Sequence, residues 1–470
     1  MLNPKKLQLT SFDFETYGLD VYNRCIKIFS YCIGYIENGK IKVIVKKYKG
    51  EGKKFLHDYL MNPNFVKIAH NMKYELSILE TNNIPFHKDT LWHDTMIESQ
   101  MLFNTRHSHS LDSIAYDFFG FTRNLDKKFK EFMKAGYTVD KIPADFLYKY
   151  QVADGIRPLL IHHLLFPDIY KDKRLRECYY NEIENIKFTQ QEEQFGIKLH
   201  QENCTAMKKV LTKGLEKLKK NYLEDLNLNS SKQLRKLFYE DLKIKPINFT
   251  TKGEPSTDKN TIMQLTKESK DPILLGIIKN RSYSAALSNI EKWETLQDRF
   301  GIIHPNINTN WARTGRRSCT NPNLYNINSK AALLNLFPVP LRRCFEPRAG
   351  FVLLPVDQAQ IELRLIIDAA QEMEVIAYLL DDPDRDLHHL TVECFSMKKI
   401  FNFIGDDIFN EGVKIAKDLK LNDPKLYSTM RSAYKNTGFA IGYGAGLDKL
   451  SQILNKKPNE IYIGYNNFVK

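Results

Sequence analysis

The chain has 470 residues and a formal net charge of +13, from 69 Lys and Arg against 56 Asp and Glu. Apolar residues make up 43% of it and aromatic residues 12%, which supports a packed core and excludes a largely disordered chain. No apolar run reaches the ~20 residues of a membrane helix, and the start lacks a secretory leader, so we expect a cytoplasmic protein without a membrane partner. The seven cysteines lack CxxC spacing, which argues against a zinc site or a disulfide framework. The excess of basic residues indicates a polyanionic partner.

Strand-like and helical patterns alternate along the chain and predict several domains. Residues 7–14, 26–35 and 41–45 are typical of a β-meander, and helical patterns follow to about residue 165. From about 185 to 300 the pattern is mostly helical and strongly charged. A strand is predicted at 351–356, and helices from about residue 360 onward. We therefore expect an α/β domain, a helical domain and then a second region of mixed structure.

The first candidate site consists of acidic residues. Asp13 and Glu15 end an apolar strand, where the alternation of side chains sends both to one face. Paired carboxylates repel each other unless a cation lies between them, although a lone D-x-E is more often solvated charge. Glu75 follows in an Asn71-xxx-Glu75 segment, and Tyr150 and Asp154 lie four apart, on one face of a predicted helix.

In this order the residues resemble the three motifs of DnaQ-like 3′-5′ exonucleases of the type with a catalytic tyrosine. The segments 94–96 and 109–112 resemble that family too. The resemblance implies an RNase H-like mixed sheet with helices, and hydrolysis at the 3′ end of single-stranded DNA. It implies two Mg²⁺ or Mn²⁺ ions per active site, because paired hard cations stabilise both the attacking and the leaving oxygen.

By this resemblance Tyr150 would orient the attacking water, and four carboxylates would hold the metal ions. These ligands are Asp13, Glu15, Glu75 and Asp154. The family usually has Asp at the position of Glu75, so this ligand is longer by one methylene. The alternative is that three acidic motifs stand in this order by coincidence.

A second candidate site follows the predicted strand 351–356. An aspartate that ends so apolar a strand is expected to face a polar site or a cation, since an unpaired buried carboxylate is very unfavourable. The run from Asp357 to Arg364 reads D-Q-A-Q-I-E-L-R and resembles motif A of family A DNA polymerases, D-Y-S-Q-I-E-L-R. The resemblance implies that Asp357 binds both catalytic metal ions, and that Gln360 and Glu362 contact the incoming dNTP. Gln358 and Ala359 depart from the pattern.

Segments on either side extend this resemblance. Upstream, 314–327 is similar to the T-G-R-L-S-S...P-N-L-Q-N-I segment that grips the primer-template minor groove. There Arg316, Asn323 and Asn326 would contact DNA, and a planar guanidinium suits acceptor atoms in a groove. The loops 226–234 and 251–258 resemble the thumb of the same family, although each alone reads equally well as a solvated loop.

Downstream, four side chains recur every fourth residue and would form one helical stripe. They are Arg431, Lys435, Phe439 and Tyr443. Alone, the stripe reads as amphipathic surface, but after motif A it resembles motif B, which binds the incoming nucleotide. Arg431 and Lys435 would hold the triphosphate, with Lys435 as a candidate proton donor to the pyrophosphate. His388, in an Asp386-Leu387-His388 element, would face it too.

The resemblance to this bacterial and phage polymerase family predicts four parts. They are an exonuclease domain (1–180), a helical thumb (181–300), the first part of an α+β palm (301–372) and fingers (373–470). The family's further palm motif, His-Asp-Glu, is not found in the sequence, so we expect an incomplete palm, from a split or truncated polymerase, with an exposed apolar edge. The expected enzyme is a DNA-directed DNA polymerase with proofreading. It would bind primer-template DNA and dNTP, and a second polypeptide would complete its palm. The alternatives are a stand-alone exonuclease and a noncatalytic DNA-binding subunit.

Overall fold

The computed structural model divides into two compact units, Met1–Leu353 and Leu354–Lys470, which are treated separately below. The residues it describes are 2, 5–18, 21–22, 26–222, 227–228, 230–250, 252–269, 271–309, 312, 315–327, 340–371, 373–381, 420–424, 427–428, 446 and 449–450. Among the described helices, none has both the length and the apolar character needed to cross a membrane.

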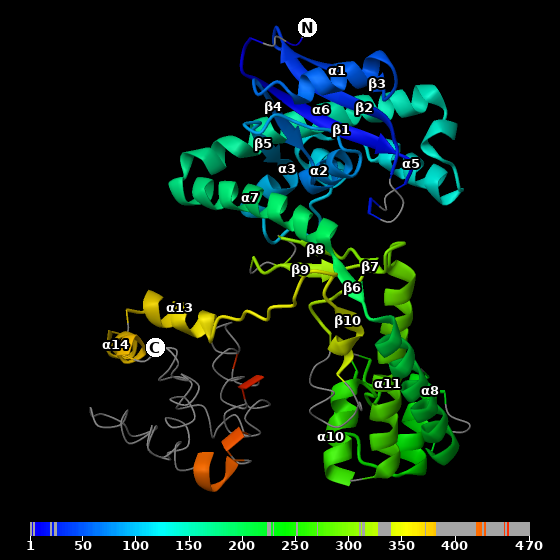
Figure 1. The fold of residues 1–470 in the computed structure, drawn as a ribbon. Coiled ribbons are helices and arrows are strands. Elements are labelled where there is room, and N and C mark those ends of the chain that lie inside the picture. Colours follow the sequence, from blue (N-terminus) through cyan, green and yellow to red (C-terminus); the bar gives the residue numbers. More distant parts are fainter. Residues whose placement is uncertain are drawn as a thin grey trace. The chain divides into compact units, whose positions relative to one another are not determined.

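The first unit opens with a five-stranded mixed sheet in the order β3-β2-β1-β4-β5 (Figure 1). Its strands are β1 (Gln8–Thr16), β2 (Ile28–Glu37), β3 (Lys40–Lys47), β4 (Phe65–Ala69) and β5 (Trp92–Asp94). Strands β1, β2 and β3 pair antiparallel and confirm the predicted meander, whereas β4 pairs parallel to β1 and β5 parallel to β4. The strand alternation buries Phe12 and Phe14 in the main core, so Asp13 and Glu15 face the other side of β1.

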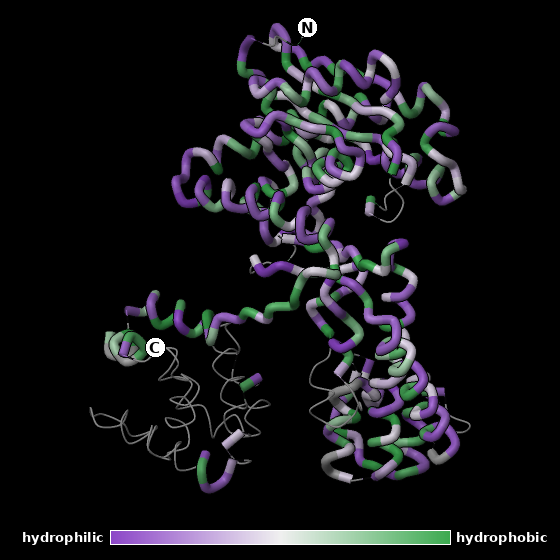
Figure 2. The backbone as a smooth tube through the Cα atoms, viewed as in Figure 1, coloured by the Kyte–Doolittle hydropathy of each residue, from purple (hydrophilic) through white to green (hydrophobic). Residues whose placement is uncertain are grey.

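Helices follow in the same domain. They are α1 (Glu51–Leu60), α2 (Met72–Thr81), α3 (Thr95–Leu102), α4 (Leu111–Phe119), α5 (Asn124–Lys134), the short η1 (Val139–Lys141), α6 (Ala144–Lys171) and α7 (Lys173–Phe195). Helix α6 packs against β1, β2 and β3. Helix α7 is largely hydrophilic (Figure 2) and runs without interruption through residue 180. The boundary expected at residue 180 between the first and second domains therefore lies inside helix α7.

The chain after α7 is mostly helical, as the pattern predicted. Its elements are β6 (Ile197–Leu199), α8 (Gln201–Tyr222), α9 (Ser231–Arg235), η2 (Lys236–Asp241), α10 (Lys259–Ser269), α11 (Pro272–Leu296), β7 (Ile302–Ile303), β8 (Asn306–Asn308), β9 (Ser318–Thr320), η3 (Leu341–Cys344) and β10 (Phe345–Glu346). Helices α8 and α11 lie side by side. One small core surrounds Trp293 and another surrounds Phe238.

The strand predicted at 351–356 is wrong: this segment is irregular and pairs with no strand among the described residues. Its apolar side chains are exposed, with 83% for Val352 and 80% for Val356. A strand needs a neighbouring backbone to accept its hydrogen bonds, and apolar composition alone does not supply one. In the second unit the described helices of more than a single turn are α13 (Ile361–Ala369) and α14 (Met373–Asp381).

Candidate active site

Three carboxylates meet where β1 lies under α6. Oxygen atoms of Asp13, Glu15 and Asp154 all lie within 4.8 Å of one another. The predicted shared face of Asp13 and Glu15 is confirmed by this grouping. Glu15 and Asp154 are buried, while Asp13 is only partly so. The cluster thus combines two buried carboxylates with a third that solvent can partly reach.

The close approach of α6 to the sheet brings Asp154 to this cluster. The Ser11 hydroxyl donates to the Gly155 carbonyl (2.5 Å) and accepts from the Gly34 amide (3.0 Å). There is no room for side chains at either glycine: a Cβ on Gly34 would lie 2.1 Å from the Gly155 oxygen, and one on Gly155 would lie 2.7 Å from Val43 Cγ1. Two glycines and a serine therefore set the distance between β1 and α6.

Burial and mutual repulsion make the cluster electrostatically unfavourable when it is fully ionised. Burial raises the pKa of Asp13 to about 7. The pKa of Glu15 rises well above its ordinary value, through burial and then through the charges of Asp13 and Asp154. The pKa of Asp154 is raised by burial and by Asp13, and the Arg157 guanidinium opposes this shift. These carboxylates need a compensating cation to be ionised together.

Glu75 supplies a fourth carboxylate from the first turn of α2. It is buried, and its Oε2 atom has no hydrogen-bond partner among the residues that the structure describes. Burial and the charge of Asp13 raise its pKa. It lies outside the 4.8 Å group of three. An unpartnered buried carboxylate oxygen beside other carboxylates is a feature that a bound cation would explain.

Tyr150 lies on α6 one turn before Asp154. Its ring stacks on Phe129 of α5, with centroids 4.4 Å apart and planes 11° from parallel. Burial and the charge of Asp154 raise the pKa of its hydroxyl, so it remains protonated and can donate a hydrogen bond. The structure thus brings together all five residues that sequence reasoning placed in this site.

Sequence reasoning missed a buried cation that supports Asp154. Arg157 is 1% exposed, and its guanidinium lies 3.3 Å from Asp154 and 3.0 Å from Asp126 of α5. The spacing from Asp154 to Arg157 is an i,i+3 pair on one helix face, which the sequence does display. The contribution of Asp126 depends on how α5 packs against α6, which the sequence does not display.

The donor set fits hard divalent cations. Asp13, Glu15, Asp154 and Glu75 offer only carboxylate oxygens, the ligands that Mg²⁺ and Mn²⁺ prefer. One of these oxygens is buried and has no partner in the described part of the chain. These four residues would hold the metal, and Arg157 alone does not balance their charge.

Metal binding should therefore depend strongly on pH. In metal-free protein the raised pKa of Asp13 means that its favourable contribution to folding is present below about pH 4 and is lost as the pH rises toward 7. Because metal ligands must be ionised, and the pKa of every carboxylate in this group is raised, Mg²⁺ affinity should increase as the pH rises through 7. The rise in melting temperature on adding Mg²⁺, measured against EDTA, should be larger at about pH 8 than at about pH 6. An equal rise at both pH values would contradict this.

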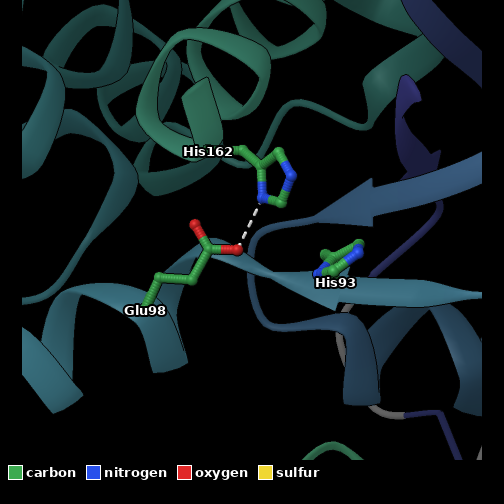
Figure 3. Close-up of side chains that lie close together, drawn as sticks. All are labelled: His93, Glu98 and His162. Carbon is green, nitrogen blue, oxygen red and sulfur yellow. Dashed lines mark hydrogen bonds and ion pairs between the residues drawn. The ribbon is translucent and has the colours of Figure 1, made fainter. Parts of the chain in front are cut away.

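A second group of potential metal ligands lies in the same domain. His93, Glu98 and His162 come from β5, α3 and α6, as Figure 3 shows, and offer ligand atoms within 4.8 Å of one another. These atoms are already joined, however, because His162 Nδ1 lies 2.6 Å from Glu98 Oε1 and Tyr179 links His93 to the same oxygen. Burial lowers the pKa of both imidazoles to about 3, so they are neutral. We interpret this group as a hydrogen-bonded network.

The residues predicted for the polymerase site are only partly described. Asp357 is exposed in an irregular segment of the second unit, and Gln360 is the left-handed residue (φ 57°) that precedes α13. Glu362 lies in the first turn of that helix. The remaining predicted nucleotide contacts lie outside the described residues. They are His388, Arg431, Lys435, Phe439 and Tyr443.

The predicted DNA contacts lie in the first unit. Arg316, Asn323 and Asn326 are all exposed, and the last two belong to one turn, in which the Asn326 amide donates to Asn323 Oδ1 (3.2 Å). The neighbouring Arg317 is partly buried and is paired with Glu192 of α7 and with Thr189.

Comparison with known proteins matches both parts of the chain to families of DNA-processing enzymes. Residues 199–469 match the sequence model of DNA polymerase family A, and residues 2–169 match that of a 3′-5′ exonuclease. DNA polymerase I of Pseudomonas aeruginosa is 23% identical over 88% of this chain and 46% of its own length. The DNA polymerase of Escherichia phage T5 is 24% identical over 86% of this chain and 48% of its own length. This chain thus spans about half the length of these relatives.

A solved structure shares the fold. It is the POL domain of Pol1 from M. smegmatis in complex with DNA primer-template and dNTP. It superposes with a TM-score of 0.72 and 17% identity, over 97% of this chain and 71% of that chain.

Proposed function

The chain belongs to DNA polymerase family A, and on this basis we propose that it combines a 3′-5′ exonuclease with part of a DNA-directed DNA polymerase. The observation that carries the exonuclease is the group formed by Asp13, Glu15 and Asp154 within the segment that matches 3′-5′ exonucleases. Its substrate is the 3′ end of single-stranded DNA.

We propose the following roles for the residues of the exonuclease site. Asp13, Glu15, Glu75 and Asp154 bind two Mg²⁺ or Mn²⁺ ions, which supply Lewis-acid stabilisation of charge on the attacking and leaving oxygens. Tyr150, held by its stack on Phe129, keeps its proton and orients the water for attack on the last phosphodiester. Arg157 holds Asp154 in place through their ion pair.

For the polymerase part we propose the predicted order of thumb, palm and fingers, in which the helical segment after α7 is the thumb. Arg316, Asn323 and Asn326 contact primer-template DNA, which their exposure permits. Asp357 binds the polymerase metal ions, with Gln360 and Glu362 beside the incoming dNTP. His388, Arg431 and Lys435 face the triphosphate. Phe439 packs on the sugar of the incoming nucleotide and Tyr443 stacks near the templating base, and all these roles rest on the motifs alone.

We further propose that the palm is completed by additional polypeptide, either a second chain or further sequence of a longer one. The support is the exposed apolar segment 351–356, which pairs with no described strand, together with Asp357 at its end, exposed to solvent. Additional strands would supply the missing backbone partners and the second acidic anchor of the metal pair.

A stand-alone exonuclease is the second candidate, because that site is complete within the described residues whereas the polymerase site is not. Two assays distinguish the candidates. The chain should shorten a 5′-labelled single strand one nucleotide at a time with Mg²⁺ and not with EDTA. Primer extension should be weak for the chain alone and rise when a polypeptide carrying the His-Asp-Glu motif is added. Extension that stays absent with that polypeptide would leave only the exonuclease, and absence of both activities would refute the proposal.

A further inference from the structure

Asp94 ends β5 and is completely buried, yet it belongs to none of the candidate metal sites. Its carboxylate accepts four backbone N–H groups from two different helices. Oδ1 accepts from Met96 (2.8 Å), from Ile97 (3.4 Å) and, more distantly along the chain, from Asn71 (3.1 Å), while Oδ2 accepts from Met72 (2.8 Å). One side chain therefore caps the beginning of α3 and the beginning of α2 together.

Helix α2 depends on this remote cap. Its own preceding residue, Asn71, has left-handed backbone angles (φ 69°, ψ 56°) and makes no side-chain capping hydrogen bond. That conformation presents the amides of Asn71 and Met72 to Asp94. Glu75 lies in the first turn of α2, so the hydrogen bonds that the Asp94 carboxylate accepts from the start of this helix fix the turn that carries Glu75. Among the described residues Glu75 Oε2 has no hydrogen-bond partner, so no bond to that atom holds the carboxylate in place.

Tyr179 holds the backbone of Asp94 and links it to Glu98, one of the residues drawn in Figure 3. The Asp94 backbone amide donates to the Tyr179 hydroxyl (3.0 Å), which donates to Glu98 Oε1 (3.1 Å). The same oxygen lies 2.6 Å from Nδ1 of His162, on α6 two turns after Asp154. The network thus joins α2 and α6, the helices that present the Glu75 and Asp154 carboxylates.

We propose that Asp94 is a positioning residue of the exonuclease site: through Met72 and Asn71 it places the Glu75 carboxylate for cation binding. This inference rests on the proposed exonuclease function. Outer-shell groups that orient metal ligands typically contribute 10–100-fold to metal affinity or activity.

The substitution Asp94→Asn tests this directly. An asparagine that keeps Oδ1 in place still caps α3, but it replaces Oδ2 with an N–H₂ group that faces the Met72 amide. The substitution therefore removes the capping hydrogen bond of Met72 in α2 and keeps that of α3. We expect the half-saturating Mg²⁺ concentration to rise about tenfold, both by calorimetric titration and in nuclease assays. The KM for single-stranded DNA should stay unchanged, and kcat should recover at saturating Mg²⁺. Asp89→Asn, at an aspartate whose side chain is 68% exposed, is the matched control.

Several outcomes would overturn the inference while leaving the exonuclease itself intact. One is an Asp94→Asn protein with wild-type Mg²⁺ affinity and a lower melting temperature, which would show a structural role only. If circular dichroism shows that Asp94→Asn does not fold, the variant Tyr179→Phe tests the positioning role instead. It removes only the hydroxyl beneath Asp94 and should raise the half-saturating Mg²⁺ concentration at least about twofold; unchanged affinity would refute the positioning role. A wild-type chain without Mg²⁺-dependent nuclease activity would instead refute the proposed function.

Discussion

Replacing Asp13 with asparagine should lower the rate of 3′-5′ hydrolysis by about 10³-fold and at the same time stabilise the metal-free protein. The loss of rate is expected because a carboxylate ligand contributes several kcal/mol of charge stabilisation through the metal it holds, and about 4 kcal/mol corresponds to 10³ in rate. After burial, the charge of Asp13 is the next largest cause of the raised pKa values of Glu15, Glu75 and Asp154. Its neutralisation relieves repulsion that opposes folding above neutral pH.

The measurements are single-strand degradation with Mg²⁺ and thermal unfolding in EDTA at about pH 8. The Mg²⁺-induced rise in melting temperature should shrink in the variant even though its metal-free melting temperature is higher. Asp58→Asn, on α1 with a side chain 65% exposed, makes the same change of charge and should affect neither quantity. Nuclease activity that survives Asp13→Asn would show that the site is assigned to the wrong residues.

Replacing Gly34 with alanine should destabilise the first unit by about 3 kcal/mol and abolish most of the nuclease activity. The added Cβ would lie 2.1 Å from the carbonyl oxygen of Gly155, which is backbone and cannot rotate away. Helix α6 would have to move outward, and Asp154 and Tyr150 would move with it. The effect on activity should therefore exceed what the loss of folded protein explains.

Gly155→Ala provides the matched comparison, since its added Cβ meets side-chain methyls of Val43 instead of backbone. The double variant Gly155→Ala/Val43→Ala should recover much of the stability and activity lost in Gly155→Ala. The pair Gly34→Ala/Val43→Ala should recover nothing. Denaturant unfolding gives the free energies, and nuclease rates at saturating Mg²⁺ give the activities. Equal rescue of both glycine variants would contradict the assignment of the obstacle at Gly34 to the Gly155 carbonyl.

The local parts of the exonuclease site could be predicted from sequence because they follow from the periods of single elements. Alternation along β1 places Asp13 and Glu15 together, and a four-residue spacing places Tyr150 and Asp154 on one face of α6. The resemblance to family A polymerases predicted the family, and the matches to the polymerase and 3′-5′ exonuclease family models confirm it.

The segment 351–356 shows where such local reasoning fails. Its composition favours a strand, but a strand forms only where another backbone pairs with it, and none of the described strands does so. Asp357 therefore follows an irregular, exposed segment, and its proposed metal-binding role still depends on the motif.

The amino-acid sequence by itself determined the family, the order of the motifs and the residue types of the proposed exonuclease site. Only the tertiary structure decided how they meet. Ser11 and Gly155 are 144 residues apart and bring α6 onto the sheet, while Asp94 caps a helix that begins 22 residues earlier in the chain. The physical reason is that side-chain periodicity acts within one element, whereas close backbone approach and shared capping depend on how separate elements pack.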